Sequence, residues 1–190
     1  MSLEEALAHR RSVREFAPTA LKLSEISRLV WAAQGVTAPG HRTAPSAGAT
    51  YPLEVYLAVG TAENLAAGVY HYLPDRHRLE VVSAGDIRTQ LAHAAISQTW
   101  ISQAPLVVVI AAVFDRTSAR YGKRAERYVH MEAGHAAQNL LLQATALELG
   151  ATTVGAFNDS EVSRLLQLPS GATPLYLIPL GRPARAQTGY

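Results

Sequence analysis

Hydrophobic positions repeat with a helical period in two segments near the amino terminus. Ser2 and Glu5 have the spacing of a capping box, which predicts a short helix running toward Arg10. Ser24 can cap a second helix, and Gly35 provides its end, because glycine commonly follows the last helical position. The apolar stripe of this second helix consists of Ile26, Leu29, Val30 and Ala33.

Runs of β-branched and aliphatic residues predict a sheet farther along the chain. The run 106–113 has no polar position, which is typical of a central strand buried on both faces. The runs 68–72 and 78–82 are joined through Pro74 and Asp75 and indicate a hairpin. Further strands are predicted at 54–59, 152–156 and 175–180.

The segments between these strands predict shorter helices and one long loop. Asp86 can cap a helix that reaches Ser97, and Asp159 can cap another that reaches Leu168. Residues 37–52 contain three prolines and two glycines, so we expect them to form a loop.

The segment 123–149 contains no proline and predicts one long helix that ends at Gly150. Between Val129 and Gly150 the only charged side chains are Glu132 and Glu148, whereas a helix with a solvated face carries many more. We therefore expect both faces of this helix to be covered. A symmetric partner subunit would cover the second face, and burial within one large core is the alternative.

Composition narrows the class of protein. A chain of 190 residues fits a single domain, 1–190. The charged fraction is 17%, below the ~25% usual for soluble domains, and association between subunits would explain the deficit. The net charge is only +2 with scattered basic residues, which argues against nucleic acid as a partner, and the absence of cysteine excludes disulfides and thiolate ligands.

Neither a secretion signal nor a membrane anchor is predicted. The amino terminus is acidic and amphipathic, unlike the basic region and apolar run of a signal peptide. The longest apolar run, 105–114, is far shorter than the ~20 residues of a spanning helix. We expect a cytoplasmic enzyme without a membrane partner.

A cluster of positive charge follows the first predicted helix. Arg10, Arg11 and Arg14 surround Ser12, which gives three guanidinium groups and a hydroxyl within five positions. Arginine forks can bind a phosphate group at this place. The alternative is that these basic residues only complement the helix dipole and remain solvated.

Two segments of small residues could approach a flat ligand through their backbone. The first is Pro45, Ser46, Ala47 and Gly48, directly before a strand, and the second includes Val154, Gly155 and Ala156. Each could instead be an ordinary turn or bend. His130 and His135 have no metal-ligand spacing, and the chain has no serine-nucleophile elbow, P-loop or dinucleotide fingerprint.

Taken in order, these motifs resemble the nitroreductase family over nearly the whole chain. The resemblance rests on residues 10–14, 45–48, 132–135 with 138–139, and 155–157. Residues 68–72 and 121–124 resemble the SagB-type branch, which includes azoline oxidases of peptide maturation. Arg120 stands where those oxidases tend to carry lysine, and no acidic residue lies near Gly155, where many relatives have one.

The resemblance implies an α+β fold with a mixed, mostly antiparallel sheet flanked by helices. It also implies an intertwined homodimer with two FMN sites at the subunit interface. Within each site, one chain would hold the flavin phosphate, ribityl chain and ring, and the partner chain would contribute the loop with Ser46. By this resemblance the FMN contacts are Arg10, Arg11, Ser12, Arg14, Pro45, Ser46, Ala47, Gly48, Val154, Gly155, Ala156 and either Arg182 or Arg185.

Three functions are compatible with these residues. In the leading one, FMN accepts a hydride from NADH or NADPH and reduces an electron-poor acceptor such as a nitro compound or quinone. In the second, the flavin dehydrogenates an azoline-like or other peptide-derived substrate and is reoxidised by oxygen. In the third, the protein is a flavin-free or flavin-storing binding subunit of a larger assembly. Tyr121 is the candidate catalytic acid or hydrogen-bond donor.

Overall fold

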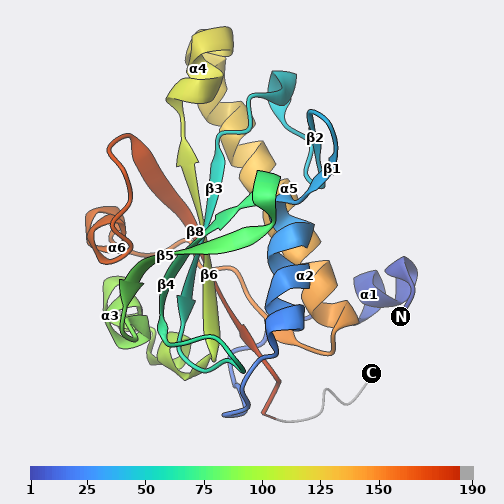
Figure 1. Ribbon diagram of the computed structural model, residues 1–190, viewed down its shortest axis with the longest axis vertical. Helices are drawn as coiled ribbons and strands as arrows, with labels where there is room; N and C mark the ends of the chain where they lie inside the picture. Colours follow the sequence, from blue (N-terminus) through green and yellow to red (C-terminus); the bar gives the residue numbers. More distant parts are fainter. Residues whose placement is uncertain (185–190) are drawn as a thin grey trace.

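Six strands form one antiparallel sheet in a computed structural model that describes residues 1–184 (Figure 1). The strand order is β5–β4–β3–β6–β8–β7, and each pairing between neighbouring strands is antiparallel. The predicted α+β fold with a mostly antiparallel sheet is therefore confirmed. The strands are β3 (Leu53–Val59), β4 (Gly68–Leu73), β5 (Arg78–Ala84), β6 (Leu106–Val113), β7 (Gly150–Ala151) and β8 (Ala172–Gly181).

Helices cover both faces of this sheet (Figure 1). One face carries α1 (Leu3–His9), α2 (Leu23–Gln34) and α5 (Ala125–Ala146), and the other carries α3 (Arg88–Ala94) and α6 (Asp159–Leu165). The helix α4 (Asp115–Tyr121) extends beyond the carboxyl end of β6. The shorter elements are β1 (Val36–Ala38), β2 (His41–Arg42), η1 (Ala47–Ala49), η2 (Pro74–Arg76), η3 (Thr99–Gln103) and η4 (Gly122–Arg124).

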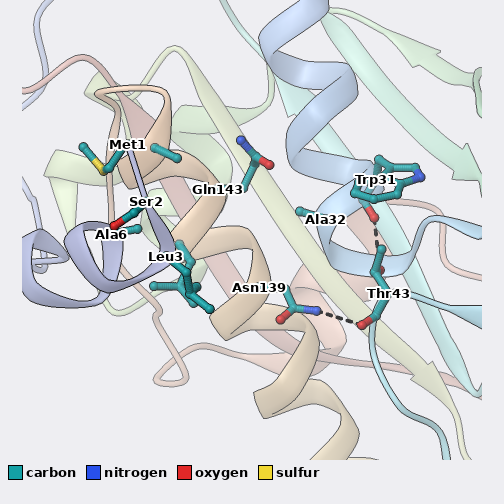
Figure 2. A pocket seen from close by; sticks show the side chains of 11 residues that line it. Met1, Ser2, Leu3, Ala6, Trp31, Ala32, Thr43, Asn139 and Gln143 are labelled. Atoms are coloured by element: carbon teal, nitrogen blue, oxygen red, sulfur yellow. Dashed lines mark hydrogen bonds between the residues drawn. The ribbon is translucent and has the colours of Figure 1, made fainter. Parts of the chain in front are cut away.

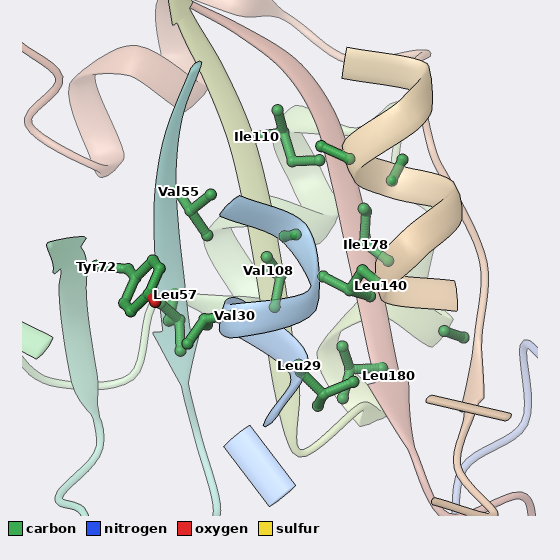
Figure 3. Close-up of a cluster of buried hydrophobic side chains, with 14 of the residues drawn as sticks. Leu29, Val30, Val55, Leu57, Tyr72, Val108, Ile110, Leu140, Ile178 and Leu180 are labelled. Atoms are coloured by element: carbon green, nitrogen blue, oxygen red, sulfur yellow. The ribbon is translucent and has the colours of Figure 1, made fainter. Parts of the chain in front are cut away.

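The larger core lies between the sheet and the pair α2 and α5 (Figure 3). Leu29 of α2 lies beside Leu180 of β8, and Leu140 of α5 lies beside Ile178 of β8, and all four side chains are buried. Residues 106–112 of β6 are also completely buried, because α3 and α6 cover the opposite face. The prediction of a central strand buried on both faces is confirmed.

The first helix begins as predicted, whereas three other predicted caps are wrong, since Ile87, not Asp86, directly precedes α3. Ser2 Oγ accepts from the Glu5 backbone N–H at 3.1 Å, which completes the capping box. The second helix begins at Leu23, one residue before the predicted cap Ser24, because the Lys22 backbone N–H donates to Glu25 Oε2 at 2.8 Å. Asn158, not Asp159, caps α6 by accepting from the backbone N–H of Glu161 at 3.0 Å.

The region around the predicted long helix differs in its details. Residues 115–121 form the separate helix α4, which ends at Gly122, with φ of 53°, and η4 then leads into α5. The long helix has 22 residues and a length of about 33 Å. The predicted strand 152–156 is wrong, since β7 ends at Ala151 and Val154 forms only an isolated bridge with Leu177. No described helix is long and apolar enough to cross a membrane.

Candidate active site

The predicted phosphate-binding segment lies along the β7 edge of the sheet. Ser12 forms a parallel bridge with Ala151, and the Val13 backbone N–H donates to the Ala151 carbonyl at 3.1 Å. The close approach depends on Gly150, because a Cβ atom there would lie 2.6 Å from Val13 Cβ. The sheet edge therefore holds the backbone between Arg11 and Arg14 in place.

The positive charges of the arginines in this segment are not neutralised by nearby carboxylates in the described residues. Arg11 donates to the carbonyl groups of Ala8 and Arg10, at 2.8 and 2.9 Å. The Arg14 guanidinium lies 5.8 Å from the centre of the Trp100 ring. Within residues 1–184, none of the side chains of Arg10, Arg11 and Arg14 pairs with a carboxylate. Their charges remain available to an anion.

The predicted ring-facing segment lies near the same arginines. Val154 and Leu177 exchange two backbone hydrogen bonds, of 2.8 and 3.0 Å, so the segment is fixed to β8. Gly155 and Ala156 are exposed, and a Cβ atom at Gly155 would meet nothing within 4 Å. The Ala156 carbonyl accepts from Gln98 Nε2 at 3.3 Å. Since Gln98 is two positions from the Trp100 that contacts Arg14, one short connection links both predicted segments.

Of the two predicted carboxyl-terminal arginines, Arg182 and Arg185, the structure describes only Arg182. Arg182 donates to Glu25 Oε1 at 2.5 Å and to the Leu147 carbonyl at 3.2 Å, and so connects β8 to α2 and to the end of α5. Its guanidinium is therefore already paired in the single chain. Arg185 lies outside the described residues.

The second group of predicted residues surrounds Tyr121. Gly48 has φ of 60°, and a Cβ atom added there would lie 2.6 Å from Tyr121 Oη. The Gly48 carbonyl accepts from Arg120 at 3.1 Å, and Ser46 Oγ accepts from the Tyr51 backbone N–H at 2.9 Å. Pro45 is exposed and Ala47 is half-buried in the same loop. The structure thus brings residues 45–48 and Tyr121 together.

The two groups lie at opposite ends of β6. Val113 donates to the Pro52 carbonyl, which places the loop with Gly48 beside the carboxyl end of the strand. Leu106 pairs with Leu180, which pairs with Ala151, so the arginine segment lies at the amino end. Because β6 has 8 residues, its ends are roughly 23 Å apart. The two groups therefore do not meet within one chain.

Glu132 is a buried carboxyl that the sequence analysis did not place in the site. Its side chain lies in the middle of α5 and is only 3% exposed. Burial raises the pKa of Glu132 to about 7, although the Ser46 hydroxyl and the Arg42 charge act in the opposite direction. Its Oε1 atom has no hydrogen-bond partner in the described part of the chain. In the sequence, the indication of this residue was a single acidic side chain within an apolar helical segment. The Glu132 carboxyl can hold a proton beside the loop at 45–48.

A surface cavity also lies beside α5 (Figure 2). It has a volume of about 270 Å³ between α1, α2 and α5, and Asn139 closes one side by donating to the Thr43 carbonyl at 3.2 Å. None of the predicted cofactor residues lines it. Among residues 1–184, no group of three or more His, Asp and Glu residues could hold a metal ion.

Comparison with known proteins identifies the family. The sequence pattern of the Nitroreductase family matches residues 7–182. The chain belongs to the nitroreductase family. It is thus a nitroreductase-family oxidoreductase, in agreement with the resemblance of its motifs.

Individual members of the nitroreductase family show the extent of the similarity. The nitroreductase-family protein MJ1384 of Methanocaldococcus jannaschii is 47% identical over 183 residues, which cover 96% of this chain and 91% of the relative. A nitroreductase-family structure from Ralstonia eutropha has a TM-score of 0.86 and 32% identity, covering 97% of this chain and 84% of that one. The microcin B17-processing protein McbC of Escherichia coli is 31% identical over 157 residues, which cover 78% of this chain but only 57% of McbC.

Proposed function

We propose that this protein is a homodimeric FMN-dependent oxidoreductase that takes a hydride from NADH or NADPH and reduces an electron-poor organic acceptor, such as a nitro compound or quinone. The observation that carries the proposal is the position of the two groups at opposite ends of β6. In a two-fold symmetric dimer, the loop of one chain can reach the arginine segment of the other. Each site would then contain residues from both subunits.

The residues at the arginine end fit a flat anionic cofactor. Arg10 and Arg14 have guanidinium groups free to form charge-assisted bonds with a phosphate. The backbone N–H groups of Gly155 and Ala156 have no partner within residues 1–184, and the space in front of Gly155 is open. These N–H groups can donate to the ring and stabilise negative charge on it. The bound FMN supplies the two-electron chemistry.

Exposed apolar side chains support the dimer. Trp31 on α2 is 43% exposed and Met131 on α5 is 54% exposed, and Leu3 and Leu7 of α1 are exposed on the same side of the sheet. The cavity of Figure 2 lies among these helices. Apolar surface of this kind marks interaction sites. We infer that a second copy of the chain covers α5, as its low charge predicted.

Similarity to McbC favours one alternative reaction. McbC is named for the processing of microcin B17, so a peptide-derived substrate is the second candidate. Tyr121 would then donate a hydrogen bond or a proton to the substrate. Arg120 is too basic to act as a general base beside it. Oxygen-dependent oxidation of a peptide azoline would support this reaction, and NAD(P)H oxidation coupled to quinone reduction would support the first.

The cofactor site is tested by changing Arg10 and Arg14 together to alanine. Loss of two charge-assisted bonds is expected to weaken FMN binding by several kcal/mol, or at least a hundredfold. The control changes Arg76 and Arg164, which are exposed elsewhere, to alanine and should leave FMN affinity unchanged. Flavin fluorescence titration gives the affinities.

Two outcomes would contradict the proposal. Equal affinity in the Arg10/Arg14 variant and the control would remove the phosphate site. Purified protein that is colourless and gains no thermal stability from added FMN would instead favour a flavin-free binding subunit.

A further inference from the structure

The loop that follows β2 has a strained backbone. Gly48, Ala49 and Tyr51 have φ values of 60°, 53° and 45°. This left-handed region favours glycine, so Ala49 and Tyr51 adopt a conformation that is uncommon for their residue types. Such conformations persist only where the surrounding structure holds them, and they often occur at functional sites. The contacts of Tyr51 therefore indicate how the loop is kept in place.

Tyr51 is held at its backbone and at its ring. Its backbone N–H donates to Ser46 Oγ at 2.9 Å, and its carbonyl accepts from Arg116 at 3.1 Å. The phenol donates to the Gly40 carbonyl at 2.6 Å, and the Arg42 guanidinium lies 4.5 Å from the centre of the ring. The bond to Ser46 closes the turn itself, because it joins two residues that are five positions apart.

The Ser46 hydroxyl connects this turn to α5. Its oxygen accepts from the Tyr51 backbone N–H, so its single hydrogen is free to be donated. The acceptor is the carboxylate of Glu132, whose charged form is stabilised by hydrogen bonding to the side chain of Ser46. A directed chain of hydrogen bonds therefore runs from Tyr51 through Ser46 to Glu132. Because this chain uses the hydroxyl hydrogen, Ser46 cannot also donate it to a cofactor.

The packing of α5 does not explain why a carboxylate is buried at this position. The Glu132 side chain is 3% exposed, and Val129 and Ala136, one turn away on either side, belong to the apolar core. An apolar side chain of similar size would avoid the desolvation of a carboxylate. The polar groups that act on Glu132 come from the loop, since Arg42 lies there with Ser46 and is fixed by donating to the buried Gln34 at 3.0 Å.

We propose that Glu132 is a positioning residue that holds the loop at 45–48, through Ser46, in the shape required to cover a flavin. The inference rests on the proposed function, because it assigns this loop to the FMN site of the partner subunit. In this role the carboxylate contacts Ser46 rather than the cofactor. The competing interpretation is that Glu132 is only a buried polar group and that the turn keeps its shape without it.

Two substitutions of Glu132 separate these interpretations. Glu132→Gln keeps an oxygen that can accept from Ser46, whereas Glu132→Leu removes every acceptor at a similar volume. The first measurement is hydrogen exchange of the Tyr51 amide in the full-length protein without FMN at pH 8, above the Glu132 pKa of about 7. Exchange should become at least about tenfold faster in Glu132→Leu, because a hydrogen bond to a charged group is lost, and change by about threefold or less in Glu132→Gln.

Two controls accompany this measurement. The amides of β6 lie in the completely buried central strand and exchange through global unfolding, so they show whether a variant has lost overall stability. Glu126→Leu changes an exposed carboxylate on the same helix and should leave Tyr51 exchange unchanged. Unchanged Tyr51 exchange in Glu132→Leu, or equal effects of the leucine and glutamine substitutions, would overturn the inference.

FMN affinity, measured by flavin fluorescence titration, is the second readout. Glu132→Leu should weaken FMN binding at least about tenfold, and Glu132→Gln should remain within about threefold of the wild type. Full FMN affinity in Glu132→Leu would overturn the inference alone and leave the proposed function intact. Wild-type protein that binds no FMN would overturn the proposed function and the role of Glu132 with it.

Discussion

Glu132 is the residue whose environment departs most clearly from what its type prefers. It lies in the apolar middle of α5, is almost fully buried, and has an oxygen with no partner in the described residues. Ser46 and Arg42 act on it from the loop that carries part of the proposed site. The protonation state of Glu132 on α5 therefore depends on the hydrogen bonding and charge of Ser46 and Arg42.

Replacing Glu132 with glutamine should change how stability depends on pH. Because the pKa is raised from 4.5 to about 7, the folded state binds more protons than the unfolded state between these values. The free energy of unfolding should therefore fall by up to about 3 kcal/mol as the pH rises from 4.5 to 8. Glu132→Gln should remove most of this fall, as measured by urea unfolding across that range.

The matched control for this prediction is Glu126→Gln, which changes an exposed carboxylate on the same helix. Its pH dependence should follow the wild type. A Glu132→Gln profile that also follows the wild type would show that Glu132 titrates like a solvated carboxyl.

Residue types alone indicated the candidate contacts but not their partners. The run around Ser12 and the small residues at 45–48 were visible because unusual residue types are adjacent in the sequence. Pairings across long separations had no local signal. The Arg182–Glu25 bond spans 157 positions and the Ser27–His77 bond spans 50.

At the scale of elements, the apolar patterns of the sequence predicted the buried strand more accurately than the capping residues predicted where helices begin. The strand at 106–113 was predictable because both of its faces are covered, which requires a continuous apolar run. The helix α4 was missed because it buries only Thr117 and so has no apolar stripe. The start of α2 was missed because the accepting side chain is Glu25 inside the first turn, and the residue before the helix, Lys22, has no capping side chain.

We predict that the exposed face of α5 forms part of the interface between two subunits. Met131→Glu places a charge on the proposed interface, where desolvation would be costly, and should shift the protein toward monomer. Sedimentation velocity at several concentrations measures the change. Val81→Glu is the control, because Val81 is also exposed and apolar but lies on β5. If both variants sediment like the wild type, α5 is not the interface.

For the whole molecule, the sheet fixes where a cofactor site can form. The antiparallel order places residues 10–14 at one end of β6 and β8 and residues 45–48 with Tyr121 at the other, while Val154 pairs with Leu177 near the middle of β8. The low charge of the long helix predicted a covered face, yet the single chain leaves that face open at Met131. The proposed second subunit would account for both observations.

Complementation between two defective variants tests the shared site most directly. One variant carries Arg10→Ala with Arg14→Ala, and the other carries Gly48→Val, which strains the loop against Tyr121. In a mixed dimer one site would lack both parts and the other would be intact, so random mixing should restore FMN to about a quarter of the sites. Flavin content of co-expressed protein near this fraction is the predicted result. Flavin content no higher than that of either variant alone would contradict a site built from two subunits.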